Sequence, residues 1–434
     1  MRIAVVGSGI AGNSAAWALS DVHDVVLYEK RNRPGGHSAT VEIDYDGETI
    51  AVDTGFIVYN ELNYPNLSAL FGHLGIKSHE SDMSFSVSVD GGQREWAGTN
   101  LGTIFGQRRN LLSPRFLWML REILRFNKLA IADRAQGLLY GRSLGDYLAA
   151  RRFARAFIDD YLIPMGAAIW STPAKEMLDF PADSFVAFFE NHRLVSFDRP
   201  KWRTVTGGSR VYVERLLQPL RGKIRLASPV AEIKRVDGRV EVRDESGNLD
   251  VFDQVVIAAH TDQTLAMLGD ASGQEREMLS AVPYRANTVY LHRDTSLMPK
   301  RQRVWSSWNY MRSTAPDAPG SDVSVTYWMN RLQGIDNARP LFVSLNPVKP
   351  PHEDLTFGTY TYDHPQFGEN ALKGQLMLKR LQGKRNTWFC GAWCGYGFHE
   401  DGLVSGLDVA RGLGAEIPWE VGADGQARIA EAAE

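Results

Sequence analysis

The first residues of the chain that could bind a ligand form a glycine-rich turn. Gly7, Gly9 and Gly12 follow the apolar run 3–6 and precede a helical pattern at 13–19. At this spacing the first glycine allows a tight bend, the second lets the backbone approach a pyrophosphate, and the third lets the helix pack on the strand. Unpaired N–H groups at the helix start then favour the phosphates. The expected contacts with a dinucleotide are the turn residues Gly7, Ser8, Gly9, Ile10, Ala11 and Gly12.

An acidic residue stands where the ribose of such a ligand would lie. Residues 24–28 form a second apolar run, and Glu29 ends it 17 positions after Gly12. A carboxylate there accepts hydrogen bonds from ribose hydroxyls and repels a 2′-phosphate. Because strand, turn, helix, second strand and acid occur in the required order, the pattern predicts a dinucleotide-binding unit rather than a coincidental glycine-rich turn.

A second glycine-bearing loop follows Glu29 and indicates which dinucleotide is bound. With its Gly-Gly pair at 35–36, the chain resembles flavoproteins of the amine oxidase and phytoene desaturase superfamily, although it has His37 where arginine is common. The resemblance extends to segment 52–55, which follows an expected hairpin at 41–51, and it implies FAD as the cofactor. The contacts that it implies in these segments are Lys30, Arg31, Gly36, His37, Ser38, Thr54, Gly55 and Phe56.

The resemblance continues near the other end of the chain. Residues 386–390 predict a strand, and a helix is expected to begin near Gly402. Its N-terminal N–H groups would face the flavin edge on which negative charge develops during reduction. Glu400 and Asp401 either contact the flavin or only cap this helix. The cofactor residues implied for the middle and the end of the chain are Val230, Ala258, Gly391, His399, Glu400, Asp401, Gly402 and Leu403.

Together the motifs predict an α/β protein with two domains. One is a Rossmann-like FAD-binding domain assembled from discontinuous segments, and the other is a mixed α+β substrate domain. The length of 434 residues also favours more than one hydrophobic core. The FAD-binding domain is expected at 1–80, 203–270 and 386–415, the substrate domain at 81–202 and 271–385, and a tail at 416–434.

Composition argues against several classes of protein. The formal net charge of −3 argues against a nucleic-acid partner. Cys390 and Cys394 are the only cysteines, which excludes a disulfide framework, and we expect two half-buried thiols rather than a metal site. No apolar run reaches the roughly 18 to 20 residues of a membrane span, and no signal peptide precedes the first strand. We therefore expect a cytoplasmic protein.

One segment is nevertheless a candidate for contact with lipid. Residues 113–114 are expected to start a helix that is rich in aromatic and basic side chains. Arg121, Arg125 and Lys128 would lie on one face of this helix. Such a helix either packs on the core with a solvated basic face or lies in a lipid interface. In the second case, residues 108–128 would form a peripheral contact with the inner membrane.

Two apolar segments predict a pocket for a greasy substrate. Residues 160–171 are apolar and aromatic, and a helix is expected from Pro181 onward. His192 follows Phe188 by four positions and therefore shares its face. These segments form either a substrate pocket or an ordinary core with a satisfied histidine. The residues expected to line the pocket are Met165, Trp170, Phe185, Phe188, Phe189 and His192.

Five segments together resemble a narrower bacterial group within the superfamily. They are 53–60, 64–67, 164–166, 362–365 and 397–403. Members are predicted NAD/FAD-binding proteins or amine oxidases, and one branch is similar to the flavin-dependent fatty acid desaturase of furan fatty acid biosynthesis. The resemblance implies an FAD-dependent oxidoreductase that dehydrogenates a fatty acyl chain by hydride transfer to flavin N5. The candidate catalytic bases are His364, Tyr362 and His192, since histidine titrates near neutral pH.

Three further functions stay open, and the first is amine oxidation. Flavin amine oxidases commonly use a lysine in the substrate domain, and this chain has none between Lys234 and Lys300. That absence lowers the expectation of amine oxidation without excluding it. The second function is that of a non-catalytic flavin- or lipid-binding protein. The third is that of an NAD(H)-dependent protein, against which the carboxy-terminal segment argues.

Overall fold

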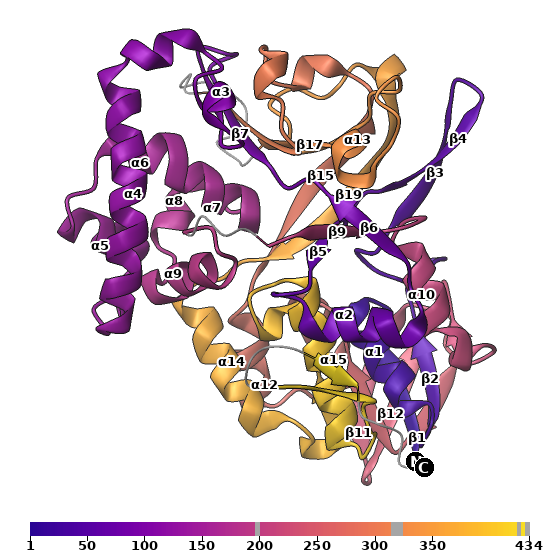
Figure 1. Cartoon of the computed structure of the whole chain (residues 1–434). Helices are drawn as coiled ribbons and strands as arrows, with labels where there is room; N and C mark the ends of the chain where they lie inside the picture. The colour runs from indigo at the N-terminus through magenta and orange to yellow at the C-terminus, as the bar shows by residue number, and fades with distance from the viewer. Residues whose placement is uncertain (196–199, 314–323, 423–426, 430–434) are drawn as a thin grey trace.

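A computed structural model describes residues 1–195, 200–313, 324–422 and 427–429 of the chain. A five-stranded parallel sheet, in the order β10-β2-β1-β14-β20, forms the lower part of the view in Figure 1. Its strands are β1 (Arg2–Val6), β2 (Asp24–Tyr28), β10 (Ile224–Arg225), β14 (Gln254–Ile257) and β20 (Thr387–Phe389). The predicted α/β fold class is confirmed, and each strand of this sheet that the apolar runs predicted is present.

The two faces of this sheet are buried against different layers. Ile3 and Val5 pack on the side of α1 (Ile10–Leu19) and α15 (His399–Gly412), whereas Ala4 and Val6 pack on the opposite side. Successive side chains of a strand point to opposite faces, so a strand covered on both sides must be apolar throughout. The second layer consists of β11 (Val230–Val236), β12 (Arg239–Asp244), β13 (Leu249–Phe252), α12 (Gly273–Ser280) and α14 (Glu369–Leu381).

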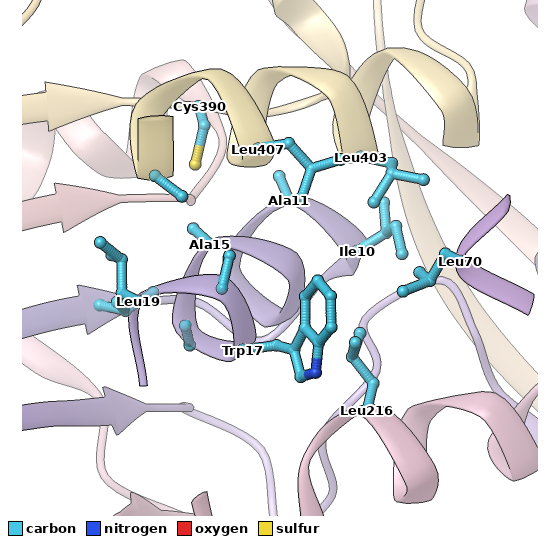
Figure 2. Close-up of a cluster of buried hydrophobic side chains, with 14 of the residues drawn as sticks. Ile10, Ala11, Ala15, Trp17, Leu19, Leu70, Leu216, Cys390, Leu403 and Leu407 are labelled. Atoms are coloured by element: carbon cyan, nitrogen blue, oxygen red, sulfur yellow. The ribbon is translucent and has the colours of Figure 1, made fainter. Parts of the chain in front are cut away.

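Glycines allow helices from the two ends of the chain to touch. A Cβ atom at Gly406 would lie 2.2 Å from the carbonyl oxygen of Ala11, and one at Gly402 would lie 2.8 Å from Ile10. Figure 2 shows Leu403 and Leu407 of α15 beside α1 in this cluster. The contact brings residues about 390 positions apart together, and it positions both ends of the predicted cofactor site.

Helix α15 begins at His399, three residues before the predicted start near Gly402. Phe398 has an extended backbone and serves as the N-cap, and its N–H donates to the Asp401 carboxylate at 2.9 Å. An acidic side chain at this position stabilises a helix start three residues upstream. The glycine at 402 is therefore inside the first turn, where it serves packing rather than initiation.

The second sheet is mixed and has seven strands, in the order β19-β15-β18-β17-β16-β7-β8. These strands are β7 (Phe85–Val89), β8 (Arg94–Ala97), β15 (Tyr284–His292), β16 (Trp308–Arg312), β17 (Ser324–Trp328), β18 (Phe342–Leu345) and β19 (Thr356–Pro365). All seven come from the two segments predicted for the substrate domain. The domain boundaries themselves stay a prediction.

A helical layer lies beside the second sheet, with α4 along the outer edge of the molecule in Figure 1. Its helices are α3 (Leu101–Ile104), α4 (Pro114–Ala135), α5 (Leu144–Ala150), α6 (Arg155–Phe157), α7 (Ile163–Trp170), α8 (Ala174–Leu178) and α9 (Ala182–Asn191). The hydroxyl of Ser113 accepts from the N–H of Phe116, as expected for the start of α4.

Smaller elements connect the two sheets. The predicted hairpin is present as β3 (Thr40–Tyr45) and β4 (Glu48–Asp53), and its turn residues Asp46 and Gly47 have positive φ angles of 53° and 91°. Further elements are β5 (Tyr59–Asn60), β6 (Ser78–Ser81), β9 (Trp202–Val205), α2 (Pro65–Leu74), α10 (Arg210–Leu216), α11 (Thr261–Met267) and β21 (Trp419–Val421).

Part of the predicted tail is packed. Trp419 is buried and stacks on Trp17 with ring centroids 5.9 Å apart. Residues 423–426 and 430–434 of that tail lie outside the described residues. Among the described helices none is both long and apolar enough to cross a membrane. Cys390 and Cys394 are free thiols, and no cluster of possible metal ligands occurs within the described ranges.

Candidate active site

A cavity of about 480 Å³ lies between the two sheets. The parallel sheet contributes Gly9 after β1, His260 after β14 and Gly391 after β20. Ligands of open α/β sheets bind at the carboxyl ends of the strands, which is where these residues stand. The second sheet, the helical layer and segment 54–58 supply further parts of the wall. The cavity therefore joins the predicted cofactor loop to the predicted substrate segments.

The glycine-rich turn has the geometry that a pyrophosphate requires. Gly7 has φ +102°, and a Cβ atom there would lie 2.7 Å from the carbonyl oxygen of Ala258. A Cβ atom at Gly12 would lie 1.8 Å from the carbonyl oxygen of Gly7. Gly9 lines the cavity, and a Cβ atom there would meet nothing within 4 Å. The first and third glycines are thus required for packing, and the second leaves room for a ligand.

Glu29 holds the turn and the next loop together. Its Oε2 accepts from the N–H of Ser8 at 3.0 Å, and its Oε1 accepts from the N–H of Arg31 at 2.8 Å. A carboxylate has further lone pairs that ribose hydroxyls can use. Lys30 Nζ donates to Gln263 at 3.1 Å, and Val230 begins β11. Ser8, Glu29, Lys30, Arg31 and Val230 lie outside the cavity lining, so their roles in binding stay predictions.

His37 lies where three segments meet. Its ring centroid is 5.1 Å from that of Tyr362 and 5.5 Å from that of His364. Burial, reinforced by the neighbouring His364 and His260, holds the pKa of His37 well below its usual value. Nε2 of His37 is buried and has no hydrogen-bond partner among the described residues. An unpaired polar atom in a ligand cavity is a feature that a bound group would satisfy.

His399 is held by an aromatic ring and two hydroxyl groups. It stacks on Phe56 with ring centroids 3.9 Å apart, and its Nε2 is 2.6 Å from the hydroxyl of Tyr212. The hydroxyl of Ser38 bonds to that of Tyr212 and lies 3.3 Å from the same Nε2. Burial lowers the pKa of His399 to about 3. The ring is therefore neutral, and Phe56 and His399 both border the cavity.

The four residues after His399 serve the fold in this structure. Glu400 accepts from the N–H groups of Asn66 and Leu67, both at distances below 3 Å, and so caps α2 rather than its own helix. The side chain of Asp401 caps α15. Gly402 and Leu403 pack against α1. None of the four borders the cavity, and their proposed contact with the flavin stays a prediction.

Glu400→Gln is expected to cost stability at pH 5 and to cost less at pH 8. Burial raises the pKa of Glu400 to about 7 from 4.5, so the folded state binds a proton that the unfolded state releases. The stabilisation is present below about pH 4.5 and is lost as the pH rises through about 7. Glutamine has no such dependence, and its amide loses the bond from Leu67 N–H. We expect the penalty to shrink by about 2–3 kcal/mol between the two pH values.

Thermal and denaturant unfolding of the flavin-loaded protein at both pH values measures this change. A penalty that grows with pH would contradict the raised pKa of Glu400. Weaker flavin binding without any change in stability would contradict its capping role.

The three candidate bases all border the cavity. The hydroxyl of Tyr362 lies 2.7 Å from that of Thr54. His192 donates from Nδ1 to the carbonyl oxygen of Phe188 at 3.1 Å, and its ring stacks on the Phe188 ring with centroids 3.7 Å apart. Burial lowers the pKa of both His192 and His364 to about 4. Each imidazole is therefore neutral at pH 7, and each can accept a proton.

The predicted substrate pocket is correct in part. Met165, Trp170 and Phe188 border the cavity with His192. Phe185 and Phe189 instead stack on each other at 4.3 Å and are fully buried, so the prediction for these two was wrong. Both point from α9 into the helical layer, because an amphipathic helix of ten residues presents only one side to the cavity.

Sequence reasoning missed His260 as a polar residue of the site. His260 stacks on Tyr284 at 4.2 Å, and its Nδ1 lies 3.8 Å from the carboxylate of Asp363. Burial lowers the pKa of His260. The position of His260, directly after the apolar run 255–259, was a usable signal, since residues after a parallel strand face the ligand.

The fold and the cavity define a dinucleotide-dependent oxidoreductase whose two sheets enclose one site. The chain belongs to the family of flavin containing amine oxidoreductases, whose sequence profile matches residues 10–334. Its cofactor is FAD, and it is an FAD-dependent oxidoreductase. The open space at Gly9 and the unpaired Nε2 of His37 fit this cofactor.

Solved structures share the fold at low sequence identity. The CLA-producing fatty acid isomerase from P. acnes has a TM-score of 0.65 and 16% identity, over 94% of this chain and 98% of that chain. A wild-type putrescine oxidase bound to putrescine has a TM-score of 0.65 and 16% identity, over 95% and 99%. The cyclohexylamine oxidase from Brevibacterium oxydans IH-35A has a TM-score of 0.64 and 14% identity, also over 95% and 99%.

A curated relative matches in sequence over a short stretch. The 15-cis-phytoene desaturase of Synechococcus elongatus is 36% identical over 88 residues. The match spans 20% of this chain and 18% of that relative. This match supports the assignment of the chain to the amine oxidase and phytoene desaturase superfamily.

Proposed function

We propose that the protein dehydrogenates, and so desaturates, a fatty acyl chain with FAD as cofactor. The observation that carries the proposal is the lining of the cavity beyond the cofactor loop. Aromatic and aliphatic side chains dominate it, and within the described ranges no lysine lines it. Its polar groups include five imidazoles and several tyrosine hydroxyls. The apolar residues are Phe85, Trp96, Tyr161, Met165, Ile169, Phe188, Leu194, Trp308 and Tyr327.

An apolar, largely uncharged cavity suits an alkyl chain better than a cation. Burial of methylene groups supplies binding energy of about 0.8 kcal/mol each. An ammonium group would instead lose its hydration on entering the cavity, and this loss must be offset by carboxylates. Asp363 is the only carboxylate among the described residues of the lining. Exclusion of water also protects the reacting carbon from side reactions. The lining therefore favours an acyl substrate.

Desaturation removes a hydride and a proton from adjacent carbons. Bound FAD supplies the acceptor for the hydride. The protein must hold the chain in place and provide a base for the proton. We assign the base to His364, because it adjoins His37 and lies on β19 beside Tyr362. His192 and Tyr362 are the remaining candidates.

The pH dependence of turnover is expected to be unusually flat on the acid side. With a pKa of about 4, His364 stays unprotonated as the pH falls from 8 to 5, whereas an ordinary histidine with pKa 6.5 would be mostly protonated at pH 5. We expect kcat/KM at pH 5 to retain about nine-tenths of its value at pH 7. A half-maximal rate near pH 6.5 would contradict this assignment.

Amine oxidation is the second candidate. Asp363 and the aromatic walls could receive a cation, and a putrescine oxidase shares the fold. A fatty acid isomerase shares it equally, so the fold alone does not choose between the two. The cavity lining is the observation that favours the acyl substrate.

Anaerobic mixing of the flavin-loaded protein with substrates tests the proposal. Bleaching of the flavin absorption by a lipid extract or a long-chain unsaturated fatty acid, but not by a panel of amines, is the expected result. Bleaching by amines alone would assign amine oxidation. Tight lipid binding without bleaching by either class would assign a non-catalytic lipid-binding role.

A further inference from the structure

The outward face of α4 is apolar and basic. Leu117, Trp118 and Leu124 are 45%, 49% and 58% exposed, although the helix has a complete buried face of its own. Arg121 and Lys128 are exposed among them, at helical spacing from Leu117 and Leu124. The outward face therefore combines large apolar side chains with cations along a helix of 22 residues.

The expected basic face is corrected in one residue. Arg125 turns sideways, where it donates to Glu122 Oε2 at 2.9 Å and to the carbonyl oxygen of Arg151. Arg121 instead lies over the ring of Trp118, with 4.6 Å from its guanidinium carbon to the ring centroid. Leucine and tryptophan, rather than a third cation, complete the outward face.

The segment before α4 also exposes apolar and basic side chains. Leu101 and Leu112 are 73% and 88% exposed. Arg108 and Arg109 are exposed between them and have no ion pair within the described ranges. We call eleven of the exposed side chains between residues 101 and 131 the α4 surface. Its members are Leu101, Arg108, Arg109, Leu111, Leu112, Leu117, Trp118, Arg121, Leu124, Lys128 and Ile131.

The α4 surface carries no exposed carboxylate. Glu122 is the only acidic residue between Trp96 and Ala132, and it is buried against Arg125 and the N–H of Ala154. Asp133, which follows, is buried as well and binds Arg151. A protein of net charge −3 thus presents a locally cationic apolar surface.

We propose that the α4 surface docks on an anionic lipid bilayer. Exposed leucine and tryptophan enter the boundary between headgroups and acyl chains, while arginine and lysine meet lipid phosphates. A second copy of this chain is a poorer occupant, because a twofold contact would place the same cations opposite each other. A bilayer supplies the negative charge that an uninterrupted set of cations requires.

The position of the helix links docking to the site. On its buried side, α4 contributes Phe116 and Met119 to the same apolar cluster as the cavity residues Trp96, Tyr161 and Phe188. In Figure 1, α4 lies at the outer edge of the helical layer, and α7 and α9 lie on its inner side. These two helices supply the cavity residues Met165 and Phe188. Supply of substrate from the bilayer rests on the proposed function, whereas docking itself does not.

Co-sedimentation of the flavin-loaded protein with vesicles tests the proposal. We expect binding to phosphatidylcholine vesicles that contain phosphatidylglycerol, weak binding to phosphatidylcholine alone, and weakening by salt. The double variant Leu112→Glu/Trp118→Glu is expected to bind the anionic vesicles about tenfold more weakly or worse. Both side chains are exposed, so folding should be unchanged, and thermal unfolding verifies this.

The matched control is Leu249→Glu/Leu376→Glu, which adds the same two charges at exposed leucines of β13 and α14. It is expected to bind vesicles as the wild type does. Equal binding by wild type and by the α4 variant would overturn the proposal. A wild-type dimer that the α4 variant dissociates, without vesicle binding by either protein, would assign the surface to a second copy. None of these measurements depends on turnover, so failure of docking and failure of the proposed chemistry are distinguishable.

Discussion

Gly9→Ala is expected to lose most of its affinity for FAD while keeping its fold. Gly9 has φ −68°, which alanine adopts freely, and its added methyl group would meet no protein atom within 4 Å. The methyl would instead occupy the cavity at the turn where a pyrophosphate must approach the backbone. A forced overlap of this kind costs about 2 kcal/mol, which corresponds to roughly 30-fold in Kd. Flavin fluorescence titration of the apoprotein measures it.

Gly72→Ala is the matched control, because Gly72 is exposed in α2 and an added Cβ atom also meets nothing within 4 Å. Its FAD affinity should equal that of the wild type. Wild-type affinity in Gly9→Ala would mean that the cofactor phosphates lie elsewhere. Unfolding of Gly9→Ala would contradict the structure of the turn itself.

His364→Gln is expected to slow reduction of bound flavin by acyl substrate about 100-fold or more, with FAD still bound. Glutamine retains hydrogen-bonding groups of similar reach but cannot take a proton at neutral pH. Stopped-flow absorbance under anaerobic conditions measures the rate, and the flavin spectrum reports occupancy. The ring of His364 lies 5.5 Å from that of His37, which is an expected FAD contact. If the substitution disturbed His37 and released the flavin, the spectrum would show that loss.

His352→Gln provides the control, since His352 is exposed and lies outside the cavity. It should reduce the flavin at the wild-type rate. If His364→Gln does the same, His192→Gln and Tyr362→Phe identify the base among the remaining candidates. Wild-type rates in all three variants would remove these residues from the chemistry.

Local patterns were sufficient for β1 and β2 of the parallel sheet, whereas the two-residue strand β10 was not predicted. Apolar runs at 3–6 and 24–28, separated by Gly7 to Gly12, can adopt few other arrangements, since a tight turn and a short helix connect them. The start of α15 was less accessible, because glycine at 402 resembles a boundary and the capping bond of Asp401 is visible only in three dimensions.

Much of the candidate site depends on contacts that no local pattern records. His37, His260 and His364 come from three distant segments, and only the packing of two sheets brings them together. The pattern at 185–189 identified an apolar helix face but could not say that Phe185 and Phe189 point away from the cavity. Similarly, the capping of α2 by Glu400 joins residues more than 330 positions apart.

The most direct test of the proposed cofactor and substrate sites is a crystal structure of the flavin-loaded protein with a long-chain fatty acid. We expect the FAD phosphates at Gly9, the flavin ring within reach of His37 and His399, and the acyl chain along Met165, Ile169 and Phe188. An acyl chain bound outside this cavity, or a flavin remote from His37, would contradict the account.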